Sequence, residues 1–133
     1  MTNLEKASEY LNKAKVWYFL TVDNGQPKGR PFGFHMEKDG KMYLGAGTFK
    51  KVYEQLKKDQ HVEILADLGS EFMRIDATAV LVDDPALAKE ALDSMPSLKK
   101  TYEENGWTIG MFYLKDAHAE IRGLFDQKEA FDF

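Results

Sequence analysis

The spacing of the apolar residues changes along the chain, and each change marks a predicted element. Apolar positions at helical spacing predict an amphipathic helix over residues 3–14, and Thr2 with Glu5 has the capping-box pattern that starts a helix. The next run, 16–22, is rich in β-branched and aromatic residues and predicts a strand. Asn24-Gly25 accepts the positive φ angles of a tight hairpin turn, so a helix and a hairpin are expected to open the chain.

Two further strands are predicted to complete a three-stranded meander. Residues 28–36 predict the second strand, residues 38–40 a second tight turn, and residues 41–46 the third strand. Because Pro31 has no N–H to donate to a neighbouring strand, the second strand is expected to be interrupted or to lie at an edge.

The middle of the chain returns to helical spacing and then to strands. Apolar residues predict a helix over 49–58 with Thr48 as its N-cap. Residues 61–67 predict a fourth strand. Residues 71–82 predict a fifth, long enough to bend across both halves of a barrel.

In the last third, Asp84 is a suitable N-cap and Pro85 a suitable first helical residue. Together they predict a helix over 85–93. Beyond it the pattern predicts a shorter helix from Pro96 to Gly106, closing strands at 109–114 and 117–124, and a mixed tail at 127–133. Together these elements predict a single α+β domain over residues 1–133, with a mostly antiparallel sheet.

Composition narrows the possible chemistry. The formal net charge of −4 argues against tight nucleic-acid binding, which needs a cationic surface. The chain has no cysteine, so any redox chemistry must come from a bound cofactor. No apolar run approaches the ~20 residues that span a bilayer, and segment 1–15 lacks the apolar stretch of a signal peptide. We therefore expect a cytoplasmic protein without membrane partners.

The first candidate site is the segment Gly29-Arg30-Pro31-Phe32-Gly33-Phe34. Glycines within a strand weaken it and suggest that a ligand or another backbone comes close. The same residues are also compatible with a bent barrel strand that carries a surface arginine, and both interpretations remain open at this point.

The second candidate runs from Gly45 to Lys51. Glycines before a helix leave backbone N–H groups free, and the helix dipole adds partial positive charge. Lys50 and Lys51 are unusual at this end of a helix, where acidic residues are preferred, and they suit a site for an anion such as a phosphate. The alternative is a pair of solvated lysines.

The third candidate is Arg74, which lies in the apolar run Phe72-Met73-Arg74-Ile75. An arginine inside a strand needs a partner, and one of the many carboxylates is a sufficient one. The histidines His35, His61 and His118 show no metal-ligand spacing, so no metal site is predicted.

Taken in order, these segments resemble the pyridoxamine 5′-phosphate oxidase-like family of FMN-binding split β-barrels. The resemblance rests on the segments 18–27, 29–34, 41–45, 48–53, 72–75, 98–102 and 112–114, and so covers nearly the whole chain. Within the family the sequence is most similar to the short proteins related to nitroimidazole-resistance flavoproteins.

The resemblance implies a homodimer with two FMN sites at the subunit interface. Arg30, Thr48, Lys50 and Lys51 would hold the phosphate, and the segment Arg30-Pro31-Phe32-Gly33-Phe34 would line the edge of the isoalloxazine ring. Phe72, Arg74 and Trp107 would come from the partner subunit. Relatives often have Trp where Phe72 stands and Gly where Ala77 stands.

The function implied is that of an FMN-dependent oxidoreductase. It would take electrons from NAD(P)H or a reductase and reduce a small electrophile such as a nitroaromatic or a quinone. No C-terminal Arg-x-His element is present, so oxidation of a B6 vitamer is not expected, and no catalytic side chain is identified. A non-catalytic flavin-binding or redox-sensing module and a heme binder remain alternatives.

Overall fold

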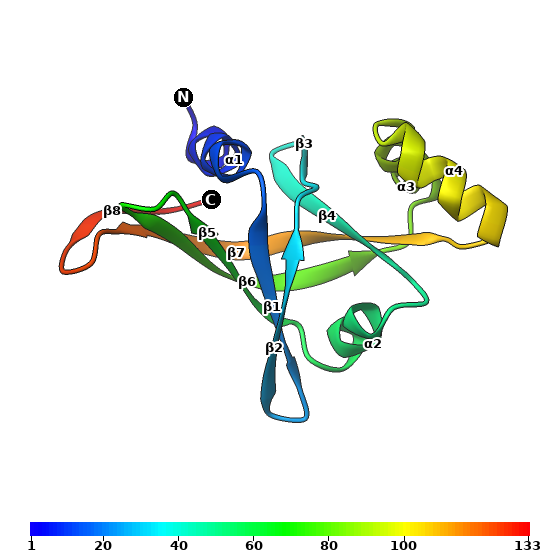
Figure 1. Cartoon of the computed structure of the whole chain (residues 1–133), viewed down its shortest axis with the longest axis horizontal. Helices are drawn as coiled ribbons and strands as arrows, with labels where there is room; N and C mark the ends of the chain where they lie inside the picture. Colours follow the sequence, from blue (N-terminus) through cyan, green and yellow to red (C-terminus); the bar gives the residue numbers. More distant parts are fainter.

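The computed structural model describes residues 1–133, which form four helices and eight strands (Figure 1). In chain order these are α1 (Asn3–Ala14), β1 (Trp17–Asp23), β2 (Gln26–Phe32), β3 (Met36–Lys38), β4 (Lys41–Gly47), α2 (Lys51–Lys58), β5 (His61–Asp67), β6 (Phe72–Val82), α3 (Pro85–Asp93), α4 (Pro96–Asn105), β7 (Ile109–Arg122) and β8 (Gln127–Asp132). None of the four helices has the length and apolar character needed to cross a membrane.

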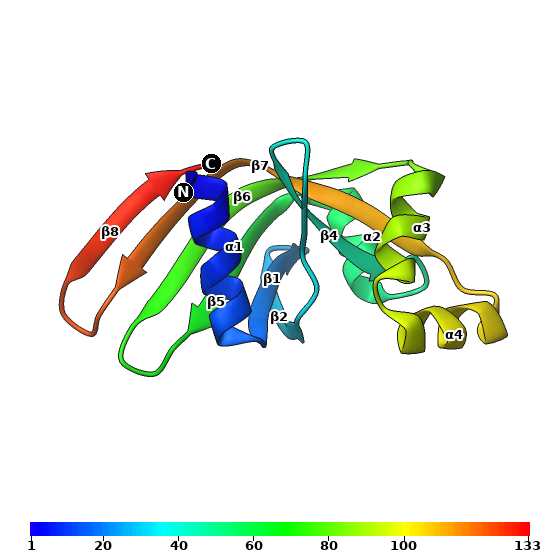
Figure 2. The ribbon, with the colours of Figure 1, turned by 90° about the horizontal axis from the view of Figure 1, so that it is seen from above.

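The strands form one antiparallel sheet in the order β2-β1-β5-β6-β7-β4-β3, and β8 pairs with β7 beside this path. The sheet curves strongly, with α1 across one part of it and α2, α3 and α4 gathered at the other end (Figure 2). The two ends of the path, β2 and β3, do not pair with each other, so the barrel stays split. This confirms the predicted α+β split barrel.

The local signals at the beginning of the chain predict its elements correctly. Thr2 and Glu5 form the expected capping box at the start of α1. Asn24 and Gly25 have φ angles of 50° and 81°, as the predicted hairpin turn requires. Asp84 accepts a hydrogen bond from the N–H of Leu87 at 3.1 Å and so caps α3 as expected.

The predicted strand 28–36 is divided. β2 ends at Phe32 and β3 begins at Met36, and β2 pairs with β1 alone, so the strand is both interrupted and at an edge, as Pro31 indicated. The prediction of a three-stranded meander is wrong in one respect. β4 forms backbone pairs with β3 and β7 and none with β2.

The two closing strands predicted at 109–114 and 117–124 are one strand, β7. The register against β6 shifts between Asp76 and Thr78, and Asp116 on β7 has a φ of 53°. A bulge of one residue reverses the alternation of side chains. Phe112 before it and Ala119 after it therefore both face the core, which made one strand look like two.

The C-terminal tail, predicted as mixed, forms β8 along β7. Its pattern of exposed residues is interrupted only by Phe131, which is buried. A single apolar residue gives little periodicity, so the sequence alone did not reveal this strand.

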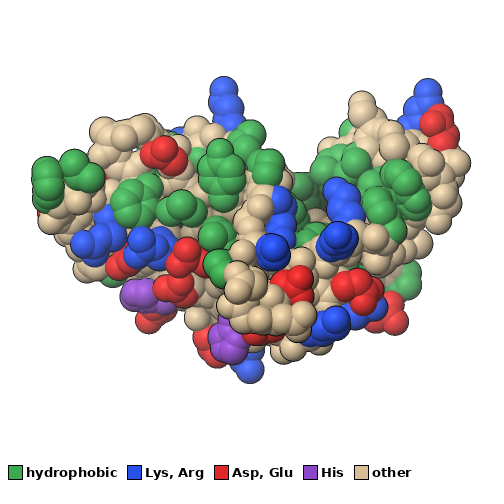
Figure 3. All heavy atoms as spheres, turned by 60° about the horizontal axis from the view of Figure 1, so that its bottom comes forward, with side chains coloured by type: hydrophobic (Ala, Val, Ile, Leu, Met, Phe, Trp, Pro, Cys, Tyr) green, Lys and Arg blue, Asp and Glu red, His purple; other side chains and the backbone are tan.

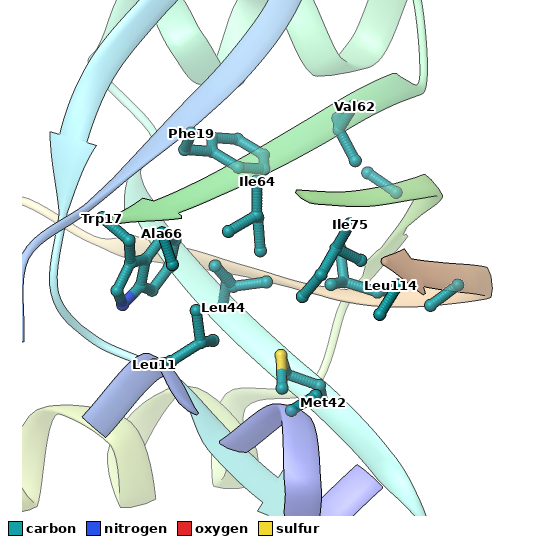
Figure 4. Packing of buried hydrophobic residues seen from close by; sticks show 14 of the residues in the cluster. Leu11, Trp17, Phe19, Met42, Leu44, Val62, Ile64, Ala66, Ile75 and Leu114 are labelled. Carbon is teal, nitrogen blue, oxygen red and sulfur yellow. The ribbon is translucent and has the colours of Figure 1, made fainter. Parts of the chain in front are cut away.

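The main core lies between α1 and the concave side of the sheet. It is a cluster of 21 buried residues, and Figure 4 shows many of them pointing toward one another from β1, β4, β5, β6 and α1. A second cluster of six residues lies on the other side of the sheet, under α3 and α4. These are Tyr43, Leu87, Ala91, Tyr102, Ile109 and Met111.

Candidate functional site

The turn from β4 into α2 differs from its prediction. Thr48 is not the N-cap, because Lys50 occupies that position and Lys51 is the first helical residue. The Thr48 hydroxyl instead lies 2.6 Å from the Thr108 hydroxyl, and the backbone N–H of Thr48 donates to the Thr108 carbonyl at 3.0 Å. A contact with a distant part of the chain therefore takes the place of the local cap.

The start of α2 is consequently uncapped. Lys50 makes no capping hydrogen bond through its side chain, and the N–H groups of Lys51 and Val52 donate to no backbone carbonyl. Neither lysine forms an ion pair, whereas Lys57 in the last turn lies 3.2 Å from Glu54. Free N–H groups, the positive end of the helix dipole and two unpaired ammonium groups make this a favourable place for an anion.

Arg30 is held against the same helix. Its guanidinium donates to the Phe19 carbonyl at 3.0 Å, to Thr21 Oγ1 at 2.9 Å and to Gln55 Oε1 at 3.0 Å. Thr21 Oγ1 also donates to Gln55 Oε1 at 2.6 Å, deep in the core. Gln55 lies one helical turn after Lys51, so Arg30 is fixed close to the start of α2.

These bonds orient Arg30 without saturating it. They use three of the five N–H groups of the guanidinium and leave two for a ligand. Partial burial lowers the pKa of Arg30, but an arginine remains charged at any physiological pH. Arg30 can therefore act as a fixed cation beside Lys50 and Lys51.

A shallow pocket of about 140 Å³ lies beside these groups. It is lined by Asp23, Lys51, Glu54, Gln55 and Lys58, so two carboxylates balance two lysines. Around the hollow that separates the α3–α4 end from the rest of the molecule, Figure 3 shows Lys and Arg side chains next to hydrophobic ones.

A much larger cavity, of about 810 Å³, opens where β6 ends and β7 begins. It is lined by Thr48, Tyr53, Leu81, Val82, Asp83, Asp84, Pro85, Ala88, Lys89, Leu92, Asp93, Lys99, Glu103, Trp107, Thr108, Ile109, Gly110 and Met111. Its volume is within the range of small-molecule sites. Since Thr48 is only two residues from Lys50, the cavity and the uncapped helix start are neighbours along the chain.

An aromatic group stands at this cavity. Trp107 stacks on Phe49 with a centroid distance of 4.2 Å, and Tyr102 meets both rings edge-on. Trp107 is still 39% exposed. Gly47 makes room for this packing, because a Cβ there would lie 2.5 Å from Phe49 Cε1.

The segment after Arg30 does not present its rings together. Phe32 packs in the main core, with its centroid 4.9 Å from that of Phe19, and Phe34 packs against the second cluster under α3 and α4. Pro31 pairs with Tyr18 at the edge of the sheet. Gly33 has only the Lys15 carbonyl near the position of a Cβ, at 3.5 Å, so other side chains are tolerated there by space alone.

Phe72 and Arg74 lie at the far end of β6 from the cavity. Arg74 lies 2.7 Å from Glu120 and 3.6 Å from Glu63, which is the carboxylate pairing that its sequence context suggested. Its guanidinium also lies over the ring of Phe72. The eleven residues of β6 span roughly 35 Å at strand spacing, so Phe72 and Arg74 lie far from the end of β6 that borders the cavity.

The structure thus brings together three of the predicted phosphate ligands, Arg30, Lys50 and Lys51, and places Thr48 and Trp107 at the adjoining cavity. Sequence reasoning missed Thr21 and Gln55, which hold Arg30. The sequence offered one sign of the role of Thr21, which is a polar residue on the inward face of β1. It offered no sign of the role of Gln55, because the partners of Gln55 are distant in the sequence.

The sequence matches a known protein family over most of its length. The sequence profile described as pyridoxamine 5′-phosphate oxidase matches residues 4–108. The chain belongs to the pyridoxamine 5′-phosphate oxidase family. Comparison with functionally curated proteins gave no match.

Solved structures extend the family assignment. A NimC/NimA family protein from Clostridium acetobutylicum is 27% identical, with a TM-score of 0.86 over 100% of this chain and 95% of its own. A pyridoxamine 5′-phosphate oxidase-related, FMN-binding protein from Nostoc punctiforme is 14% identical, with a TM-score of 0.65 over 99% of this chain and 89% of its own. These findings confirm the family resemblance inferred from the sequence.

A third structure with the same fold belongs to a protein described as heme-binding. It is a heme-binding protein from Mycobacterium smegmatis, 14% identical, with a TM-score of 0.65 over 92% of this chain and 57% of its own. At this identity the likeness speaks for the fold alone, so the cofactor has to be argued from the site.

Proposed function

We propose that the protein binds FMN and that the start of α2 receives the FMN phosphate. The observation that carries this proposal is the uncapped helix start, where Lys50 and Lys51 have no ion-pair partner and Arg30 is fixed one turn away. A dianionic phosphate would be attracted by the three cations and would accept hydrogen bonds from the two free N–H groups. One structure of this fold is described as FMN-binding and another as heme-binding, both at 14% identity, so the site itself carries the choice of FMN.

The remaining residues of the first candidate segment would border the ring. In this proposal the backbone of Pro31, Phe32, Gly33 and Phe34 lines the isoalloxazine edge, while the side chains of Phe32 and Phe34 anchor that backbone in the two apolar clusters. When bound, FMN would supply two-electron redox chemistry, such as the reduction of a quinone by two electrons and two protons to a hydroquinone. The protein contributes binding, orientation and exclusion of water.

We further propose a homodimer. The family resemblance implies that Phe72 and Arg74 contribute to the flavin site of a second copy, and both lie at the end of β6 away from the large cavity. A two-fold arrangement would create two identical sites. Light scattering should give a dimer, and a monomer that keeps full FMN affinity would contradict this part of the proposal.

The reaction proposed is reduction of a small electrophile, with electrons from NAD(P)H or a reductase. An oriented encounter at the 810 Å³ cavity replaces a random one, which lowers the barrier to electron transfer. Stopped-flow reoxidation of the reduced protein by a nitroaromatic or quinone should be faster than that of free reduced FMN. Equal rates across several acceptors would favour a sensing or storage role.

The absorption spectrum of the freshly purified protein tests the cofactor. Flavin bands in the blue and near ultraviolet are expected, and a Soret band would establish the heme alternative instead. Of the three histidines, His35, His61 and His118, His35 has both ring nitrogens hydrogen-bonded and so offers no free nitrogen to a heme iron. None of them lines the large cavity.

A further inference from the structure

The large cavity has a charge pattern that the binding of FMN does not explain. We propose that this cavity is the acceptor site and that it selects planar aromatic molecules that are neutral or cationic over anionic ones. The role of the ligand as electron acceptor rests on the proposed flavin function. The charge selectivity rests on the cavity itself and can be measured separately.

The apolar part of the lining suits a flat ring. Val82, Leu92, Ile109 and Met111 contribute aliphatic surface, and Trp107 offers an indole face that is partly exposed although it is stacked on Phe49. Apolar walls with a few polar groups are the usual composition of small-molecule sites. An aromatic ring buried here would gain both apolar contact and ring stacking.

The charged part of the lining is unbalanced. Four carboxylates face two lysines, and both lysines are already engaged. Lys89 and Lys99 each lie 2.6 Å from the carboxylate of Asp93 and hold the pKa of Asp93 below its usual value. Glu103 lies 4.0 Å from Lys99. No free cation is therefore left in the lining for an anionic ligand.

Two carboxylates remain on the β6–α3 connection. Asp84 uses one oxygen to cap α3, and Asp83 makes no ion pair or side-chain hydrogen bond. A ligand with a carboxylate or phosphate would be repelled by these groups, whereas an amine would be attracted. This pattern also disfavours phosphorylated B6 vitamers, although the fold is that of their oxidase family.

The test compares three nitroaromatic probes of similar shape: 4-nitrobenzylamine, 4-nitrobenzyl alcohol and 4-nitrobenzoate. Isothermal titration uses the protein of residues 1–133 at low ionic strength, with and without added FMN. The amine should bind about tenfold more tightly than the benzoate, with the alcohol between them. Raising the salt to 0.5 M should reduce the difference, because exposed charges are screened.

Two variants and one control locate the effect. Asp83→Asn should reduce the amine-to-benzoate ratio by about threefold, since it removes one unpaired charge. Asp126→Asn, in the distant β7–β8 turn, is the matched control and should leave the ratio unchanged. Trp107→Leu should weaken all three probes by a similar factor, because it removes the stacking surface without changing the charge.

The outcomes separate this inference from the proposed function. Equal binding of amine and benzoate, or an unchanged ratio in Asp83→Asn, would overturn the inference whatever the flavin content. Selective binding by protein that fails to bind added FMN would uphold the cavity as a binding site and contradict the FMN proposal. Affinities unaffected by Trp107→Leu would place the probes elsewhere and overturn the assignment of the cavity.

Discussion

The two apolar clusters lie on opposite sides of one sheet and differ in how tightly they are closed. The main core contains 21 buried residues and draws on α1 and the concave side of the sheet. The cluster under α3 and α4 contains six and borders an 810 Å³ cavity. The main core is closely packed, whereas the side under α3 and α4 is loosely filled, so a ligand can enter there without a cost in core packing.

A matched pair of substitutions gives the largest expected effect. Ile75→Ala in the main core should lower the free energy of unfolding by about 2–5 kcal/mol, because Ile75 is fully buried and its removal leaves a sealed void. Ile109→Ala should cost only about 1–2 kcal/mol, since Ile109 already borders open space. Urea unfolding measures both, and equal losses would remove the distinction between the clusters.

A second comparison uses two strand glycines. Gly110→Ala should destabilise by about 1–3 kcal/mol, because a Cβ at Gly110 would lie 2.1 Å from Tyr53 Cε1 and push α2 away from β7. Gly29→Ala should change stability little, since its nearest neighbour, Leu20 Cγ, lies 3.6 Å away. Thermal unfolding checks the pair, and a neutral Gly110→Ala would mean that Tyr53 can move freely.

Glu37 allows a test by pH in the polar junction between α1 and β3. Burial raises its pKa, but hydrogen bonds from His35 and Ser8 outweigh burial and hold the pKa below its usual value. A carboxyl with a lowered pKa stabilises the fold above its unfolded pKa, and that stability is lost as the pH falls through the folded value. Glu37→Gln should therefore destabilise at pH 7 and have a smaller effect near pH 3. Glu9→Gln, on the exposed face of α1, is the control.

The smallest effect is expected at the β8 end of the sheet. The hydrogen bond to Asp132 raises the pKa of His118, and both side chains are exposed. A raised histidine pKa stabilises below the unfolded value, and that contribution disappears as the pH rises through the folded value. His118→Gln should lower the melting temperature slightly at pH 5 and leave it unchanged at pH 8. A larger loss at pH 8 would contradict the assignment.

The sequence predicted those features whose causes are local. Thr2 and Asp84 cap their own helices, and Asn24-Gly25 turns its own hairpin, so neighbouring residues were sufficient evidence. Thr48 was wrongly predicted as a cap because Thr108, its partner, is remote in the chain.

The site shows the same division between local and distant causes. Lys50 and Lys51 stood out because basic residues are unusual at a helix start, and Arg30 because of its proline and glycine neighbours. The roles of Thr21 and Gln55 arise only when β1, β2 and α2 meet. The cavity likewise depends on how α3 and α4 pack on the sheet, which no local pattern specifies.

The most direct test of the central claim compares FMN with riboflavin, which lacks the phosphate. Replacing both Lys50 and Lys51 by Glu should weaken FMN by at least about tenfold and riboflavin far less, because charge-assisted bonds to the phosphate are lost. The same change at Lys13 and Lys100, on exposed faces of α1 and α4, serves as the control and should not alter the ratio of the two affinities. Titration followed by flavin fluorescence gives that ratio. A selective loss of FMN affinity in the Lys50/Lys51 variant is the predicted result, and equal weakening of FMN and riboflavin would contradict a phosphate site at the start of α2.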